Sequence, residues 1–191
     1  MTIHTKEINY MFTPLQHGTN HMLGQDNWTP LTTQNYEVRI YNIDGTSPTE
    51  NANLLTLTTD SIGDIVERQN VITVHYGNGI IKFPGKVDIN DVSWTLNCYC
   101  DPNVLEPLRA WRKQCYDAKN ETIGVQSQYR RQVYFIRYDG QWNVRDAIRC
   151  PGTWISDLDN GNYSATGDNL VQVSVNFVIS KAIYLTADEL K

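Results

Sequence analysis

Side chains that could do chemistry are scattered along this chain rather than gathered into a motif. Carboxylates are frequent in its loops, and two of them at the right separation could form the acid and base of a glycosidase. The loop carboxylates are Asp60, Asp64, Asp88, Asp91, Asp157 and Asp159. Because Asp is also a common turn former, carboxylates without a second chemical signal do not predict an active site.

Potential metal ligands form incomplete sets. Cys98-x-Cys100 lacks the second close pair of a zinc site. His17-x-x-x-His21 has no Cys-x-x-Cys before it and no glutamate after its first histidine. Gly77-Asn78-Gly79 precedes a strand pattern, so it predicts a turn rather than a dinucleotide site, and the chain has no Gly-x-Ser-x-Gly elbow and no phosphate loop. We therefore expect no catalytic residues, no metal, no cofactor and no enzymatic activity.

The composition suits one domain, or one domain with a long arm, in 191 residues. Hydrophobic residues make up 40% of the chain, whereas charged residues make up 19%, below the roughly 25% of ordinary soluble domains. A net charge of −5 argues against tight binding to nucleic acid. The short basic groups, at Arg109, Arg112 and Lys113 and at Arg130 and Arg131, predict a solvated helix face and a strand end.

The N-terminus has no apolar signal-peptide core, and no run approaches the roughly 18 apolar residues of a membrane helix, so we expect cytoplasmic synthesis. The cysteines are then predicted to be reduced core thiols. They are Cys98, Cys100, Cys115 and Cys150. Without a secretion signal, the sequons at Asn27, Asn120 and Asn162 carry little weight.

Residues 1–33 show no sustained period, although they are too apolar for an ordinary disordered tail. We expect them to form an N-terminal arm that packs on a neighbouring subunit. Residues 34–191 are expected to form the folded domain.

Most of that domain alternates apolar and polar residues with the period of a β-strand. The predicted strands are residues 36–42, 54–59, 71–76, 80–83, 89–100, 131–138, 141–148 and 170–184. Gly77-Asn78-Gly79 and Asp139-Gly140 predict hairpins. Further turns are expected at Cys150-Pro151-Gly152 and at residues 159–162.

The longest predicted strands, 89–100 and 170–184, each have one dry face and one neutral polar face. Such strands suit a large sheet or barrel with a core on one side and water, or a wide channel, on the other. A single helix interrupts them near residues 103–119, because Val104, Leu108, Trp111 and Cys115 recur at helical spacing. Asn103 and Glu106 are a candidate capping pair.

The order of these elements resembles the tail tube proteins of contractile-tailed bacteriophages, relatives of the inner-tube proteins of pyocins and type VI secretion systems. The resemblance covers residues 36–184. It lies in Tyr36-Glu37-Val38-Arg39-Ile40, in residues 71–77 leading to 81–86, in Val92-Ser93-Trp94-Thr95-Leu96 followed by Asp101, in the helix with Trp111, in Tyr129-Arg130-Arg131, in residues 142–154 and in the closing strand.

The resemblance implies a mainly β fold, a β-barrel or sandwich with one flanking α-helix. It also implies hexameric rings that stack into a tube for DNA passage inside a contractile sheath. The implied partners are the sheath, baseplate, tape-measure and tail-terminator proteins, without a membrane anchor. The implied location is the virion tail after assembly in the host cytoplasm. We expect the arm and the 44–52 loop to make contacts between rings.

Two alternatives remain open on the sequence. One is an inner-tube subunit of a pyocin or type VI-like injection system. The other is a β-sandwich module that binds a carbohydrate or receptor, in which Trp142 and Trp154 would line a ligand groove.

Overall fold

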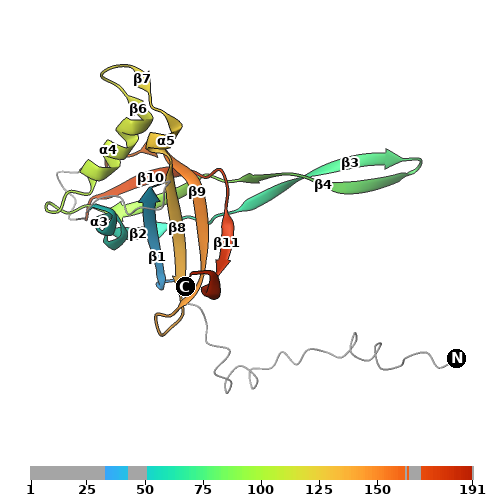
Figure 1. Ribbon diagram of the computed structural model, residues 1–191, viewed down its shortest axis with the longest axis horizontal. Helices are drawn as coiled ribbons and strands as arrows, with labels where there is room; N and C mark the ends of the chain where they lie inside the picture. The colour runs from blue at the N-terminus through green and yellow to red at the C-terminus, as the bar shows by residue number, and fades with distance from the viewer. Residues whose placement is uncertain (1–32, 43–50, 162, 164–168, 191) are drawn as a thin grey trace.

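The computed structural model describes residues 33–42, 51–161, 163 and 169–190. The fold is mainly β, as predicted (Figure 1). The strands are β1 (Tyr36–Asn42), β2 (Thr59–Ile62), β3 (Glu67–Tyr76), β4 (Gly79–Ile89), β5 (Val92–Asn97), β6 (Tyr116–Asp117), β7 (Thr122–Ile123), β8 (Arg131–Tyr138), β9 (Val144–Leu158), β10 (Gln172–Val178) and β11 (Ile183–Thr186). The helices are α3 (Asn51–Leu57), α4 (Leu105–Cys115), α5 (Gln126–Tyr129) and the 3-10 turn η2 (Ala187–Leu190).

One antiparallel seven-stranded sheet forms the body, in the order β1-β8-β9-β10-β5-β2, with β11 also paired to β9. Strand β9 is 15 residues long and joins the two halves of the sheet. One half holds β1, β8 and β11, and the other holds β10, β5 and β2. Its first part pairs with β8 and β11, and its last part pairs with β10. The sheet therefore curves around its core without closing into a barrel among the described residues.

The outer strands of this sheet, β1 and β2, are joined by side chains rather than by a ladder. The Tyr36 hydroxyl donates a hydrogen bond to the Asp60 carbonyl at 2.7 Å. From α3, the Thr56 hydroxyl donates to the Val38 carbonyl at 2.6 Å. Helix α3 thus covers the gap that a closed barrel would fill with strands.

An aromatic cluster anchors the core between the two halves and α4. Trp94 is fully buried and stacks on Phe177 at a centroid distance of 5.1 Å. Trp111 of α4 reaches the same Phe177 ring at 5.7 Å and donates its indole N–H to the Tyr129 carbonyl at 2.7 Å. The predicted helical stripe is confirmed, with Leu108, Trp111 and Cys115 buried.

The ends of α4 differ from the prediction. The helix stops at Cys115 rather than near residue 119, because Tyr116 is already extended and pairs in β6. The Asn103 side-chain oxygen accepts the Leu105 N–H at 3.1 Å. The N-cap position is occupied by Val104, however, and its side chain makes no capping hydrogen bond. The prediction of a single helix is wrong, because α3 and α5 are present beside α4.

The strand predicted at residues 54–59 is wrong. Residues 51–57 form α3, because a helix places Leu55 in the core while the Thr58 and Thr59 hydroxyls bond back to the Leu54 and Leu55 carbonyls. Leucines and threonines at these positions fit a strand pattern equally well, so burial of Leu55 in the core and the threonine hydrogen bonds together decide the outcome.

Two long strands are interrupted and one predicted turn is absent. The 89–100 strand breaks between β4 and β5, and the 170–184 strand breaks between β10 and β11, which pair with different parts of β9. The turn expected at residues 150–152 lies inside β9 instead. Gly152 has a positive φ of 76°, and the β8–β9 register shifts nearby, so a bulge replaces the turn.

Both predicted hairpins form. Tyr76 pairs with Gly79 across Gly77, whose φ of 56° is a conformation that glycine adopts without strain. In the second hairpin, the Asp139 carboxylate accepts the N–H groups of Gln141 and Asn143, both at 2.8 Å. The strand after this turn begins at Val144 rather than at residue 141.

Candidate channel-lining and assembly surfaces

The sheet half β9-β10-β5-β2 has a polar outer face opposite its core. On β5, Val92, Trp94 and Leu96 are buried, so Ser93, Thr95 and Asn97 lie on the other side. Cross-strand pairs continue this face onto β10. The pairs are Asn97 with Gln172, Thr95 with Ser174 and Ser93 with Asn176. We call this surface the polar face.

Hydrogen bonds tie the polar face to a carboxylate at each end. The Gln172 and Asn97 amides both donate to the Asp60 carboxylate at 3.2 Å. At the other end, the Ser156 hydroxyl donates to the Asp157 carboxylate at 2.9 Å, and the Asn176 amide donates to it at 3.4 Å. Strands β2, β5 and β10 contain no lysine or arginine, so the face is neutral to weakly acidic.

The structure separates Asp60 from Asp157, the two carboxylates at the ends of the polar face. Asp60 contacts Gln172, whereas Asp157 contacts Asn176, four residues further along β10. At roughly 3.3 Å per residue, this places the carboxylates about 13 Å apart. Glycosidase pairs lie roughly 5–9.5 Å apart, so these two do not form one.

Asp64 and Asp91 lie at the junction described below, Asp88 lies opposite Arg68 on the β3–β4 hairpin, and Asp159 follows β9. In the described part of the chain, no three His, Cys, Asp or Glu side chains form a potential metal site. No helix there is long and apolar enough to cross a membrane.

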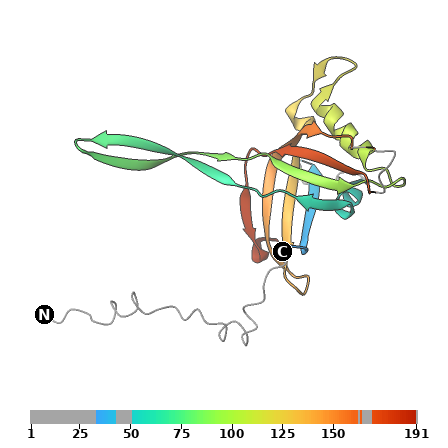
Figure 2. The same cartoon turned by 180° about the vertical axis from the view of Figure 1, so that it is seen from behind.

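The β3–β4 hairpin projects from the body as a free two-stranded ribbon, and Figure 2 shows the same projection from behind. Residues alternate between its faces, and partners across the ladder share a face. One face carries Ile72, Val74, Tyr76, Ile81 and Phe83, which we call the apolar face. The opposite face carries Val71, Thr73, His75, Ile80, Lys82 and Pro84, which we call the mixed face.

Asn90 joins this ribbon to the body through hydrogen bonds to the backbone. Its side-chain oxygen accepts the Val66 N–H at 2.6 Å, and its amide donates to the Asp64 and Asp91 carbonyls at 3.0 and 3.1 Å. Its own backbone N–H donates to the Val66 carbonyl at 3.2 Å. One side chain therefore holds both strands of the ribbon where they leave β2 and enter β5.

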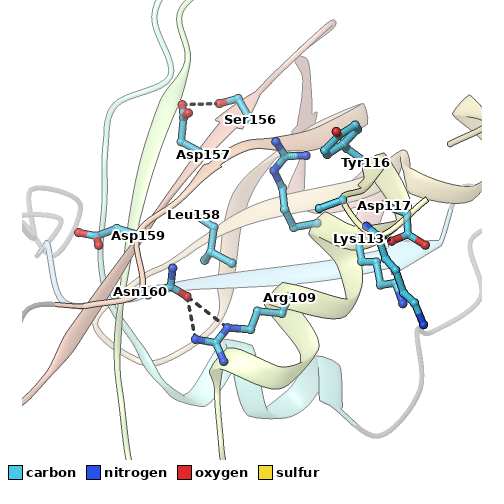
Figure 3. A pocket seen from close by; sticks show the side chains of 12 residues that line it. Arg109, Lys113, Tyr116, Asp117, Ser156, Asp157, Leu158, Asp159 and Asn160 are labelled. Atoms are coloured by element: carbon cyan, nitrogen blue, oxygen red, sulfur yellow. Dashed lines mark hydrogen bonds between the residues drawn. The ribbon is translucent and has the colours of Figure 1, made fainter. Parts of the chain in front are cut away.

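A groove of about 780 Å³ lies beside α4 (Figure 3). Arg109 points across it and donates to the Asn160 side chain at 2.8 and 3.2 Å, while Lys113 points toward solvent. Arg131 opens β8 and donates to the Gln114 side chain at 2.8 Å. Arg109 and Lys113 are exposed, as predicted for a solvated helix face, whereas Arg112, Arg130 and Arg131 are half-buried.

The four cysteines are free, and two of them are buried as predicted. Burial, with a contribution from the Glu67 carboxylate, raises the pKa of the Cys150 thiol to about 12. Burial likewise raises the pKa of Cys115. Cys98 is half-buried and Cys100 is exposed, because β5 ends at Asn97, so the prediction of a core thiol is wrong for Cys100.

Several sequence-based predictions fall outside the described residues. They include the histidine pair at His17 and His21, nearly all of the arm at residues 1–33, most of the 44–52 loop and the sequons at Asn27 and Asn162. The two tryptophans proposed for a ligand groove have separate surroundings. Trp142 is exposed in the β8–β9 turn beside Tyr138, whereas Trp154 is half-buried on β9 and packs on Tyr129.

Solved structures share this architecture and define its class, a tail-tube-like fold. A chain of the contractile injection system PVC, in its extended sheath–tube complex, has a TM-score of 0.60 at 13% identity, over 88% of this chain and 98% of that chain. A chain of the tube-terminating cap of the anti-feeding prophage has a TM-score of 0.62 at 12% identity, over 82% and 91%. The SPP1 tail tube has a TM-score of 0.54 at 14% identity, over 82% and 80%.

At such low identity these likenesses establish the fold, and they confirm that part of the resemblance found in the sequence. No family model and no curated protein matches the chain. Sequence reasoning missed the Asn90 junction, because its signal, one asparagine between two strand patterns, is common in loops. The predicted strands of this hairpin, residues 71–76 and 80–83, are also shorter than β3 and β4.

Proposed function

We propose that this chain is the structural subunit of a contractile tail tube, forming hexameric rings that stack into a conduit for DNA. The polar face carries this proposal. Each cation on a channel wall would displace counterions from passing DNA and hold it back. A wall built from the amides and hydroxyls of β5 and β10, with Asp60 and Asp157 at its ends, would let a polyanion slide.

The strand edges support ring formation. β1 and β2 lie at the two ends of the strand order, and no ladder joins them in the described part of the chain. Exposed edges favour pairing with another chain. A head-to-tail contact between unlike surfaces closes a ring laterally and leaves the ring faces free to stack.

The remaining parts of the proposal follow from this role. The tube lies inside a sheath, begins at a baseplate, encloses a tape-measure protein and ends at a terminator. It is built in the host cytoplasm and becomes part of the virion tail. The arm at residues 1–33 and the 44–52 loop make ring-to-ring contacts. Deleting residues 1–33 tests the arm, and normal tubes from the shortened chain would contradict that role.

Solved chains with this fold come from the extracellular contractile injection system PVC, and this favours an inner tube of that kind as the second candidate. The architecture is the same and the cargo differs. A carbohydrate-binding module would need Trp142 and Trp154 in one ligand groove. Trp154 instead packs on Tyr129, and Trp142 lies beside Tyr138 in the β8–β9 turn.

Negative-stain electron microscopy of the purified chain over a range of concentrations tests the proposal. We expect six-fold rings or stacked tubes above a threshold concentration. Uniform small particles at every concentration, even when a preformed baseplate is supplied as a nucleus, would contradict it.

A further inference from the structure

The β8–β9 turn holds an exposed tryptophan in a backbone conformation that residues other than glycine rarely adopt. Trp142 is 65% exposed and has a φ of 63°. We propose that Trp142 docks on the β6–β7 hairpin at the opposite end of a second copy of this chain. This inference rests on the proposed tube function and identifies one contact between its subunits.

Hydrogen bonds fix the β8–β9 turn so that it presents Trp142 to solvent. The Trp142 N–H donates to the Asp139 carbonyl at 3.1 Å, and the Asp139 N–H donates to the Asn143 carbonyl at 3.0 Å. The Asp139 carboxylate accepts the N–H groups of Gln141 and Asn143, while the Asn35 amide donates to the Asp139 carbonyl at 3.0 Å. Sparsely populated backbone conformations held in this way cluster at ligand-binding and switch sites. Because the turn is already ordered, docking it costs little conformational entropy.

Trp142 is supported on one side and open on the other. Its ring centroid lies 5.7 Å from that of Tyr138, which is buried. The rest of the indole has no cover among the described residues, as its exposure shows. Tryptophan is among the residue types that most often anchor protein interfaces, so a rigidly held and exposed one is a candidate anchor.

A matching apolar patch lies on the β6–β7 hairpin. Ile123 is 81% exposed and lies opposite Tyr116 in the ladder, so these side chains share a face. Val125, just past β7, is 63% exposed. A Cβ atom at Gly124 would lie 1.8 Å from the Gln114 carbonyl oxygen, so this hairpin packs tightly on the end of α4. We call Tyr116, Ile123 and Val125 the β7 patch.

Trp142 and the β7 patch lie at opposite ends of the body, so a single chain cannot join them. Both views show α4, β6 and β7 at one end, and the β8–β9 turn and η2 at the other (Figures 1 and 2). A contact between the two therefore runs head to tail from one copy to the next. Contacts of this kind close rings or extend stacks.

Charge favours a second copy as the occupant. Residues 105–131, at the α4 end, contain six basic and three acidic side chains, a net charge of +3. Residues 137–146 and 183–190, at the turn end, contain two basic and four acidic side chains, a net charge of −2. Hydrogen bonds from Asn143 lower the pKa of the Asp139 carboxyl, so it stays ionised. Unlike ends of two copies therefore attract each other, and like ends repel.

Aspartate substitutions at the two sites of the full-length chain test the contact. Aspartate tolerates the left-handed backbone at Trp142, and Ile123→Asp changes an exposed side chain, so both variants should fold. Leu57→Asp is the matched control, because Leu57 is 84% exposed on α3, outside both ends. Circular dichroism and urea denaturation check folding, and sedimentation velocity over a concentration series measures association.

We expect Trp142→Asp and Ile123→Asp each to raise the concentration needed for association at least about tenfold. Leu57→Asp should change it less than about twofold. An equimolar mixture of Trp142→Asp and Ile123→Asp should associate more than either variant alone at the same total concentration. The reason is that the intact β7 patch of the first variant meets the intact Trp142 of the second.

Association of either variant at the wild-type concentration would overturn the contact while leaving the tube function standing. A mixture that associates no more than its two components alone would also overturn it. A wild-type chain that stays monomeric at every concentration would contradict the tube function and this contact with it.

Discussion

The body sheet and the β3–β4 hairpin are built from the same kind of sequence and end in opposite environments. In β5, alternate apolar residues are almost completely buried, with Val92 at 1% and Trp94 and Leu96 at 0% exposure. In the hairpin, equally regular alternation leaves Ile72 53% exposed and Phe83 48% exposed. Alternation determines which side chains share a face. The subunit itself supplies the covering surface in the body, whereas the hairpin has no such cover among the described residues.

The largest difference in the free energy of unfolding should appear when one aromatic residue in each region is replaced by alanine, in two separate variants. Trp94→Ala removes a ring that stacks on Phe177 and bonds to the Thr59 hydroxyl at 3.1 Å. It should lower the free energy of unfolding by about 3–5 kcal/mol. Phe83→Ala in the hairpin should change it by less than about 0.5 kcal/mol, as measured by urea denaturation of the dispersed chain. Similar losses at both positions would mean that the hairpin packs on its own body.

A smaller effect is expected at the junction between the two regions. Asn90→Ala removes the bonds to Val66, Asp64 and Asp91 and should lower local stability by about 1–3 kcal/mol. Amide hydrogen exchange should then speed up at the junction and in β3–β4 but not in β8. Asn90→Asp keeps the acceptor for Val66 and loses both donors, so it should lower the local stability by a similar amount. Unchanged exchange in the Asn90→Ala hairpin would rule out Asn90 as the residue that positions it.

The Cys150 thiol should make stability fall at high pH. Its pKa is raised to about 12 in the folded chain from the ordinary value of 9.0. The unfolded thiol therefore loses its proton first, and the free energy of unfolding should decrease as pH rises from 9 toward 12. Cys150→Ala should flatten this decrease, as measured by urea denaturation at pH 8 to 10.5. Identical slopes in both proteins would contradict the assignment.

Glu67 connects this effect to the hairpin, because its carboxylate helps to raise the pKa of Cys150 from the first residue of β3. Glu67→Gln should lower the thiol pKa while leaving it above the ordinary value, since burial is the larger cause. Urea denaturation at pH 8 to 10.5 measures it, because a lower folded pKa makes the free energy of unfolding fall less steeply with pH than in the wild type. No change would mean that Glu67 and the thiol do not interact.

The smallest effect on folding is expected on the polar face. Thr95→Lys should change the free energy of unfolding by less than about 0.5 kcal/mol, because its side chain lies on the outer surface of the sheet. Assembled tubes carrying it should nevertheless bind single- or double-stranded DNA more tightly than wild-type tubes, with a steep salt dependence. Thr95→Gln is the neutral control. Equal DNA binding by both variants would place the polar face away from the channel.

Much of the fold was predictable from period and turn chemistry. The β1 and β8 strands, both hairpins and the buried stripe of α4 follow from residues that act locally. The errors occur where tertiary partners decide. Residues 54–59 fit either a strand or a helix, and the helix is selected by Leu55 in the core and by the threonine caps. The bulge at Gly152 depends on pairing with β8, which lies in a different stretch of chain.

The candidate surfaces were predictable in composition but not in position. The neutral polar faces of residues 89–100 and 170–184 were evident, whereas their union through the Asn97–Gln172 and Ser93–Asn176 pairs required the register. The Asn90 junction depends on backbone groups of Val66 and Asp64, which no sequence pattern brings together.

Cryo-electron microscopy of assembled full-length chain tests the central claim most directly. The account predicts six-fold rings in which Ser93, Thr95 and Ser174 face the lumen and Trp142 of each copy lies against β6 and β7 of another. Rings whose lumen is lined instead by the β1-β8-β11 side of the sheet, or an assembly without a channel, would contradict it.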